Sequence, residues 1–139
     1  MNWLFWALGA ALFAGLTAVL AKAGVKDIHP NLATAIRTSV ALLFTWVLAL
    51  ATVSPLKLES ISSRNWWFLA ASGTATGLSW ICYFNALQKG NVKQVAPIDK
   101  LSVVIAVVLA LCFLGEKVSE KEWMGISLMV AGSLVLAWK

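Results

Sequence analysis

The chain has 139 residues, of which 60% are hydrophobic and only 12% are charged. A soluble domain carries about twice that share of charged residues, so this chain lacks the polar residues that a water-facing exterior needs. The net charge of +5 comes from basic residues scattered singly between apolar runs, without the stripe or cluster that nucleic-acid binding requires. The composition therefore predicts an all-α integral membrane protein in a lipid bilayer, and it excludes a nucleic-acid-binding protein.

Five apolar runs have the length of a membrane-spanning helix, which needs about 20 mostly apolar residues. They cover residues 3–23, 30–53, 65–88, 92–114 and 119–138. Gly24 suits a left-handed cap after the first run, and Pro30 is tolerated in the first turn of the second. Ser119 and Glu122 have the spacing of a capping box at the start of the fifth. With short connections, the sequence predicts a single domain over residues 1–139.

Five spans would place the two ends of the chain on opposite sides of the membrane. The side of the N-terminus then carries four basic residues, namely Lys57, Arg64, Lys117 and Lys121, and the other side carries five, namely Lys22, Lys26, Lys89, Lys93 and Lys139. An excess of Lys and Arg on one side normally sets the orientation, and here that excess is almost absent. This balance predicts insertion in both orientations; the alternative is one orientation fixed by another feature.

Three charged residues, Arg37, Asp99 and Lys100, fall inside predicted spans, where charges are costly and usually functional. Arg37 follows Pro30 by seven residues and Asp99 follows Lys93 by six. At about 1.5 Å per residue, both lie roughly 10 Å from the same membrane side. A pair between Arg37 and Asp99 would lower the cost of burying them. The three groups either line a hydrated cavity or gate, or form a structural ion pair while Lys100 snorkels to the surface.

Polar side chains follow one face of the third predicted helix. Ser72, Thr76, Ser79 and Tyr83 are spaced by four, three and four residues, and Asn85 and Gln88 lie near the helix end. Such a stripe faces either a neighbouring helix or water. Trp46 and Trp80 lie mid-helix, where an indole either packs or forms a platform for a substrate. The candidate residues of a substrate cavity or gate are Arg37, Asp99, Lys100, Trp80, Tyr83, Asn85, Gln88 and Trp46.

Small residues recur at a spacing of four on two of the predicted helices. Gly73 and Gly77 form a GxxxG motif on the third, and Ala11 and Gly15 give a similar face on the first. Both faces predict close approach of neighbouring helices.

The sequence contains no constellation of residues that would support catalysis. His29 is the sole histidine and lies beside Pro30. No serine or cysteine lies three or four residues away from it. Cys82 and Cys112 lie in apolar runs and do not have the spacing of metal ligands. The sequence therefore predicts neither an enzyme nor a bound metal or other cofactor.

Short motifs follow one another in order along the second half of the chain. They are Tyr83-Phe84-Asn85-Ala86-Leu87-Gln88-Lys89-Gly90, Val95-Ala96-Pro97-Ile98, Leu114-Gly115-Glu116, and Trp123-Met124-Gly125 with Gly132. This ordered set resembles the EamA domain of the drug/metabolite transporter superfamily. In that family the third helix ends in Y-x-x-A-L-x-x-G, a proline lies near the start of the fourth, a Gly-Glu pair ends it, and W-x-G begins the fifth. The first half is also similar, through its Gly9 to Lys22 helix and the Asn31–Arg37 opening of the second.

The resemblance implies one five-helix EamA repeat of a secondary transporter. Usual members have ten helices, built from two EamA domains in inverted orientation around a central cavity, as in other inverted-repeat transporters. An antiparallel second copy of this chain would rebuild that form, in agreement with the weak charge bias. The resemblance thus implies an exporter of small metabolites or drugs in the bacterial inner membrane. It would act by alternating access as a dual-topology homodimer.

Two alternatives stay open beside the homodimeric exporter. One is an accessory or structural membrane subunit that pairs with another chain, and the other is a lipid-carrier flippase, since short relatives of this superfamily include such proteins. The small multidrug resistance relatives carry a membrane glutamate in their first helix, which binds protons and cations, whereas this first helix has no acid. Because Arg37 and Lys100 outnumber Asp99, an anionic or zwitterionic substrate fits better than a cationic drug.

Overall fold

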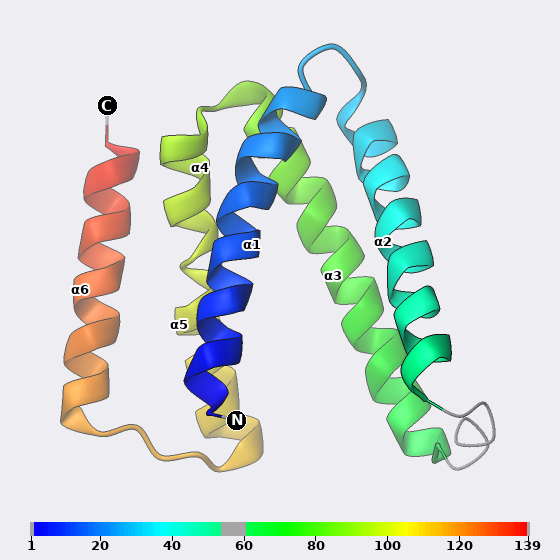
Figure 1. The fold of residues 1–139 in the computed structure, drawn as a ribbon. Coiled ribbons are helices and arrows are strands. Elements are labelled where there is room, and N and C mark those ends of the chain that lie inside the picture. The colour runs from blue at the N-terminus through cyan, green and yellow to red at the C-terminus, as the bar shows by residue number, and fades with distance from the viewer. Residues whose placement is uncertain (1, 54–60, 139) are drawn as a thin grey trace. The chain divides into compact units, whose positions relative to one another are not determined.

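The computed structural model describes residues 2–53 and 61–138, and these residues form helices joined by short turns (Figure 1). The predicted all-α fold is confirmed, and the ends of the helices match the prediction within one or two residues. The elements are α1 (Trp3–Gly24), α2 (Pro30–Thr52), α3 (Ser63–Lys89), α4 (Val92–Asp99), α5 (Ser102–Leu109), a π-helical turn (Ala110–Leu114) and α6 (Glu120–Ala137). Lys57 and Lys139, which enter the charge balance, lie outside the described residues.

Within the described part of the chain, three segments are long and apolar enough to cross a membrane: α1, α2 and Val92–Leu114. The other two helices are more polar, because α3 carries serines and threonines and α6 opens with Glu120, Lys121 and Glu122. Large apolar side chains are exposed along the helices, with Phe113 exposed to 81% and Trp138 to 85%. A surface of this kind requires lipid or a partner chain in place of water.

The fourth predicted helix is interrupted near its middle. Pro97 has no N–H group, so the helix loses a backbone hydrogen bond there. In the next turn the amides donate to carbonyls three residues back, from Lys100 to Pro97 at 3.1 Å and from Leu101 to Ile98 at 3.0 Å. Bonds of this pattern form a tighter 3₁₀ turn, which in mid-helix often marks a hinge. The single helix predicted over residues 92–114 is therefore divided, with α4 ending at Asp99.

Two helix starts follow the signals in the sequence. Pro30 is the first residue of α2, and the preceding His29 accepts a hydrogen bond at Nδ1 from the amide of Asn31 at 3.3 Å. At α6 the predicted capping box is confirmed. The amide of Ser119 donates to Glu122 Oε2 at 2.7 Å, and the amide of Glu122 donates to Ser119 Oγ at 3.4 Å. Both caps satisfy amides that the first helical turn leaves unpaired.

The left-handed helix cap lies at Gly115 instead of Gly24. The prediction for Gly24 is wrong, because Gly24 is still part of helix α1. Among the described residues, the positive φ of a left-handed cap is found at Gly115, where φ is 66°. Gly115 follows the π-helical turn, and the amide of Glu116 then donates to the carbonyl of Ala110 at 3.4 Å. The glycine therefore lets the chain leave the helix while its last carbonyls stay paired.

The substitution Gly115→Ala is expected to lower the free energy of unfolding by about 1–2 kcal/mol, since a side chain disfavours left-handed backbone. Thermal unfolding in detergent micelles measures the effect. Gly125→Ala is the matched control, because an added Cβ there meets no atom within 4 Å and the glycine lies inside α6. This control is expected to unfold at the same or a higher temperature. Equal melting temperatures for the two variants would contradict the role of Gly115.

The helices form two compact units, and the candidate site residues divide between them. One unit comprises Met1–Lys22 with Lys89–Lys139, and in it α4 packs beside α6 while Lys22 Nζ donates to the carbonyl of Gly90 at 2.8 Å. The other unit, Ala23–Gln88, holds α2 and α3. This second unit contains six of the eight candidates, and the first contains Asp99 and Lys100.

Candidate functional site

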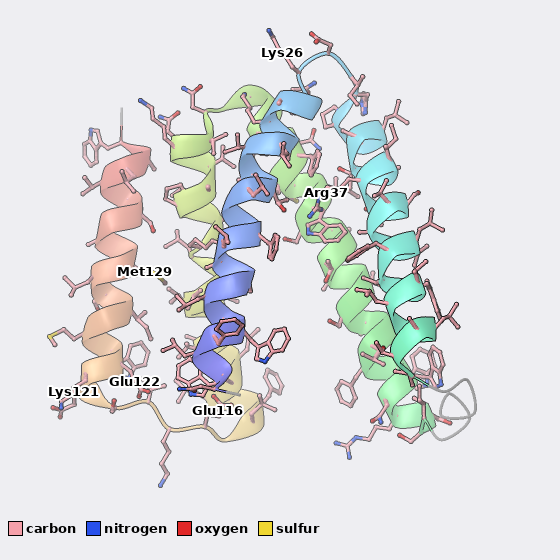
Figure 2. All side chains as sticks on the ribbon, viewed as in Figure 1. Lys26, Arg37, Glu116, Lys121, Glu122 and Met129 are labelled. Carbon is pink, nitrogen blue, oxygen red and sulfur yellow. The ribbon has the colours of Figure 1, made fainter. Side chains whose placement is uncertain are left out.

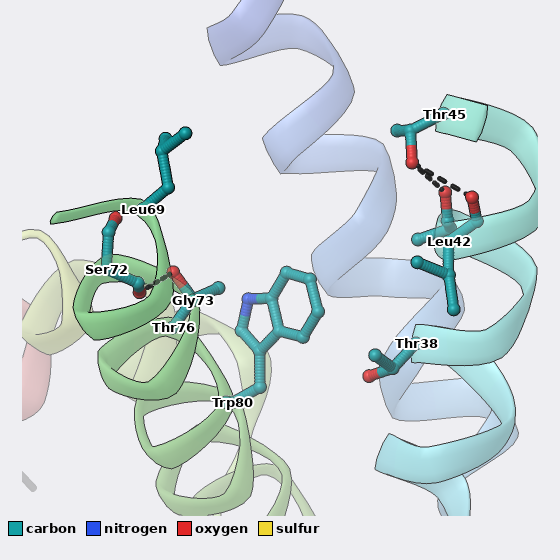
Figure 3. A pocket seen from close by; sticks show the side chains of 10 residues that line it. Thr38, Leu42, Thr45, Leu69, Ser72, Gly73, Thr76 and Trp80 are labelled. Carbon is teal, nitrogen blue, oxygen red and sulfur yellow. Dashed lines mark hydrogen bonds between the residues drawn. The ribbon is translucent and has the colours of Figure 1, made fainter. Parts of the chain in front are cut away.

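A cavity of about 440 Å³, open over much of its boundary, lies between α2 and α3, inside the unit Ala23–Gln88 (Figure 3). Each helix contributes residues spaced three and four apart, which form one face of that helix. The lining residues are Thr38, Ala41, Leu42, Thr45, Leu69, Ser72, Gly73, Thr76, Gly77 and Trp80. The volume falls within the range of roughly 300–1,000 Å³ that small-molecule sites occupy.

A cation from α2 meets an aromatic pair from α3 at one end of this face. The Arg37 Cζ atom lies 4.2 Å from the centroid of the Trp80 ring, which lines the cavity, and 5.8 Å from that of Phe84. Figure 2 shows Arg37 on the side of α2 that faces α3. Arg37 is not among the lining residues, but it directly precedes the lining residue Thr38 on α2 and lies over the ring of the lining residue Trp80. A cation over two ring faces is held in place while it is half-buried.

Three threonine hydroxyl groups on the cavity wall donate to their own helices. Thr38, Thr45 and Thr76 each donate to the carbonyl four residues earlier, at 2.7, 2.9 and 2.9 Å, and Figure 3 marks the last two of these bonds. A hydroxyl group bonded in this way has used its hydrogen and keeps lone pairs to accept from a ligand. The wall therefore offers acceptors at these three positions.

Gly73 and Gly77 make room in this unit instead of bringing two helices into contact. A Cβ atom added at either position would meet nothing within 4 Å, and both glycines line the cavity. The close helix approach predicted from the GxxxG motif is thus not made among the described residues. The same holds for Gly15 on α1, where an added Cβ also meets nothing within 4 Å.

Asn85 and Gln88 tie the end of α3 to the beginning of α2. Asn85 Nδ2 lies 3.5 Å from Asn31 Oδ1 and donates to the carbonyl of Ile81 at 2.8 Å. Gln88 Nε2 donates to the carbonyl of Ile28 at 3.2 Å, in the turn before α2. Neither side chain is among the residues that line the cavity. Their contacts hold the two helices of the unit together beside Arg37.

The remaining candidates also lie apart from the lining residues. Tyr83 packs edge-to-face on Phe84 at a centroid distance of 6.4 Å, and Trp46 is 48% exposed on α2. Asp99 and Lys100 lie at the interruption after α4, where Lys100 Nζ is 3.8 Å from Asp99 Oδ2. An Arg37–Asp99 pair would join the two units and stays a prediction. Of the eight candidates, the structure brings Arg37 and Trp80 together at the cavity.

Sequence reasoning missed the α2 side of the cavity. Ser72 and Thr76 belong to the predicted polar stripe, and the structure places both on the cavity wall. Thr38 and Thr45, seven residues apart on the facing helix, were not among the candidates. Their spacing puts two hydroxyl groups on one face of α2, close to the charged Arg37, which is the signal that could have identified them.

Comparisons with known proteins identify the family of the chain. The model of the EamA-like transporter family matches residues 1–138. The chain is 48% identical over 136 residues to the "Uncharacterized transporter in cobO 3'region" of Sinorhizobium sp., covering 98% of this chain and 96% of the relative. It is 25% identical over 130 residues to the uncharacterized transporter YxxF of Bacillus subtilis (strain 168), covering 93% of this chain and 40% of that relative.

A third relative is a probable 4-amino-4-deoxy-L-arabinose-phosphoundecaprenol flippase subunit, ArnE, of Yersinia pseudotuberculosis. The identity is 25% over 71 residues, or 51% of this chain and 62% of the relative. No solved structure matches significantly. The family match and the Sinorhizobium relative cover nearly the whole chain, so they confirm the resemblance and the prediction that the chain is not an enzyme. The chain belongs to the EamA-like transporter family of multi-pass membrane proteins.

Proposed function

We propose that the chain is a secondary transporter that exports small metabolites or drugs as an antiparallel homodimer, with residues 1–139 as one EamA domain. The cavity between α2 and α3 carries the proposal, because it gives this member of a transporter family a mostly apolar space with a few hydroxyl groups, next to a cation that lies over the Trp80 ring. The cavity, Arg37 and Trp80 would form part of the substrate path.

Two observations support an antiparallel partner. Four basic residues on one side of the predicted spans face five on the other, which leaves the orientation almost unbiased. The Bacillus relative is matched over 40% of its length, so it has room for a second segment of this size. In an inverted pair, each copy would supply one half of a site near the middle of the membrane.

Alternating access needs an element that bends, and the interruption between α4 and α5 supplies one. Pro97 and the 3₁₀ bonds that follow it weaken the helix at Asp99 and Lys100. In the antiparallel pair, the two copies would place this charged turn toward opposite faces of the membrane. We assign Asp99 and Lys100 to the rim or gate and Arg37 with Trp80 to the cavity.

A subunit of a heteromeric complex is the second candidate function. The relative from Yersinia is named a probable flippase subunit, and this name supports a role for the present chain as one subunit among several. This alternative predicts one fixed orientation, since the partner would supply the opposite one. The orientation of the chain therefore separates the two proposals.

Reporter fusions to Lys139 measure this orientation directly. We expect a cytoplasm-active and a periplasm-active reporter, fused in separate proteins, to show comparable activities at equal amounts of fusion protein. The balanced basic residues are the physical reason. Activity of only one reporter would remove the antiparallel homodimer and favour the heteromeric subunit.

A further inference from the structure

We infer that the cavity between α2 and α3 binds an organic anion, with Arg37 holding its carboxylate or phosphate group. The inference rests on the proposed function, since it names the substrate class of the same cavity. It uses the geometry of Arg37, the charges in its unit and the chemistry of the cavity wall.

The contact with Trp80 holds Arg37 in place beside the cavity. The Cζ atom lies 4.2 Å from the ring centroid, so the guanidinium lies over the face of the indole. A guanidinium carries five N–H donors in a fixed fork. The contact thus fixes the position of the side chain, and donors that do not point at the ring can bind both oxygens of a carboxylate or phosphate.

Within its unit, the charge of Arg37 is not neutralised by a described residue. Asp27 is the acidic residue of Ala23–Gln88 that the structure describes, and no ion pair between described residues joins it to Arg37. The ten residues that line the cavity are all uncharged. A half-buried cation beside an uncharged cavity favours an anion in that space. A cationic ligand finds no acid among the lining residues.

The residues of the cavity wall indicate the chemistry of the rest of the ligand, to which the anionic group is attached. Leu42 and Leu69 provide an apolar surface, and Gly73 and Gly77 leave the space open. The threonine hydroxyl groups, whose hydrogens are donated to their own helices, accept bonds from hydroxyl or amino groups of a ligand. The ligand class is therefore an anion at one end of an apolar body that carries hydrogen-bond donors.

A matched set of naphthalene compounds tests the anion requirement. The purified full chain is placed in phosphatidylcholine nanodiscs, and binding of 1-naphthaleneacetate, 1-naphthaleneacetamide and 1-naphthylmethylamine is measured. We expect the acetate to bind about tenfold or more tightly than the neutral amide, because a two-oxygen ion pair with arginine is replaced by a hydrogen bond from arginine to an uncharged carbonyl. The amine is expected to bind more weakly than the amide.

Variants at Arg37 assign the effect to this side chain. Arg37→Gln is expected to abolish the difference between acetate and amide, and Arg37→Lys to reduce it, since lysine keeps the charge and loses the fork. Arg64→Gln is the matched control: Arg64 also lies over a ring, 5.7 Å from that of Phe68, but Arg64 is exposed and Phe68, unlike Trp80, does not line the cavity. It is expected to keep the full difference. The ratio of the acetate affinity to the amide affinity, measured within one variant, does not depend on partial unfolding. Unfolding lowers the apparent binding of both compounds by the same factor.

A soluble metabolite and a lipid headgroup share this chemistry, so two further measurements separate them. Displacement of 1-naphthaleneacetate by phosphatidic acid in the nanodisc identifies a lipid phosphate. Displacement by 1-naphthyl phosphate without an effect of the lipid identifies a soluble anion. Equal affinities for acetate and amide, or an unchanged ratio in Arg37→Gln, would overturn the anion site. Failure of the anion site would not change the outcome expected from the reporter fusions. A single orientation in the reporter fusions would, in turn, not change the outcome expected from this binding test.

Discussion

Gly77→Leu is expected to close the cavity between α2 and α3 and to abolish transport while the chain stays folded. An added Cβ at this position meets no atom within 4 Å, so a larger side chain begins in empty space. That space is the cavity itself, which Gly73 and Gly77 help to line. Because leucine is also a better helix former than glycine, the substitution favours α3 as a helix.

Labelling of a single thiol measures the closure without knowledge of the substrate. In a background of Cys82→Ala and Cys112→Ala, the variant Thr38→Cys places a thiol on the cavity wall. We expect Gly77→Leu to slow its reaction with a polar thiol reagent by about tenfold or more, an amount that corresponds to roughly 1.4 kcal/mol. Binding of 1-naphthaleneacetate in nanodiscs is expected to fall by a similar factor.

Two control variants separate filling of the cavity from a general effect of a larger residue. Gly77→Ala adds one methyl group at the same site and is expected to keep most of the labelling rate. Gly15→Leu adds the same side chain to α1, where a Cβ also meets nothing within 4 Å and the residue does not line the cavity. If Gly15→Leu slowed the labelling as much as Gly77→Leu, the cavity would not be the cause.

The helices were predictable because their signals are local. Apolar runs of membrane length, Pro30 at the start of α2 and the Ser119–Glu122 box each depend on a few neighbouring residues. The interruption after α4 was harder to predict from the sequence. Pro97 stands in the sequence, but whether a proline ends a helix or only bends it depends on how the following amides find new acceptors.

The cavity was predictable only in part because it depends on two helices at once. The stripe through Ser72 and Thr76 was visible on α3, and Arg37 was visible as a charge inside a span. The sequence does not say which face of α2 meets that stripe, so the stacking of Arg37 on Trp80 had to come from the structure. The role of Gly73 and Gly77 was equally hard to predict, because a GxxxG spacing allows either a close contact between helices or an open space.

Variants with opposite charge bias are expected to associate with each other and not with themselves. Replacing Arg64 and Lys121 by glutamine leaves two basic residues on the side of the N-terminus against five on the other. Replacing Lys26, Lys89 and Lys93 by glutamine leaves four against two. Because the side richer in basic residues stays in the cytoplasm, the two variants are expected to insert in opposite orientations. All five side chains are exposed.

Co-purification with two different affinity tags then tests the antiparallel homodimer. The two oppositely biased variants, expressed together, are expected to co-purify in nearly the yield of the unaltered chain. Two differently tagged copies of one biased variant are expected to yield almost none, because a parallel pair cannot place one copy's charged turn at each face of the membrane. Efficient co-purification of a single biased variant with itself would rule out the antiparallel arrangement. Absence of any co-purification, the unaltered chain included, would instead favour a partner of different sequence.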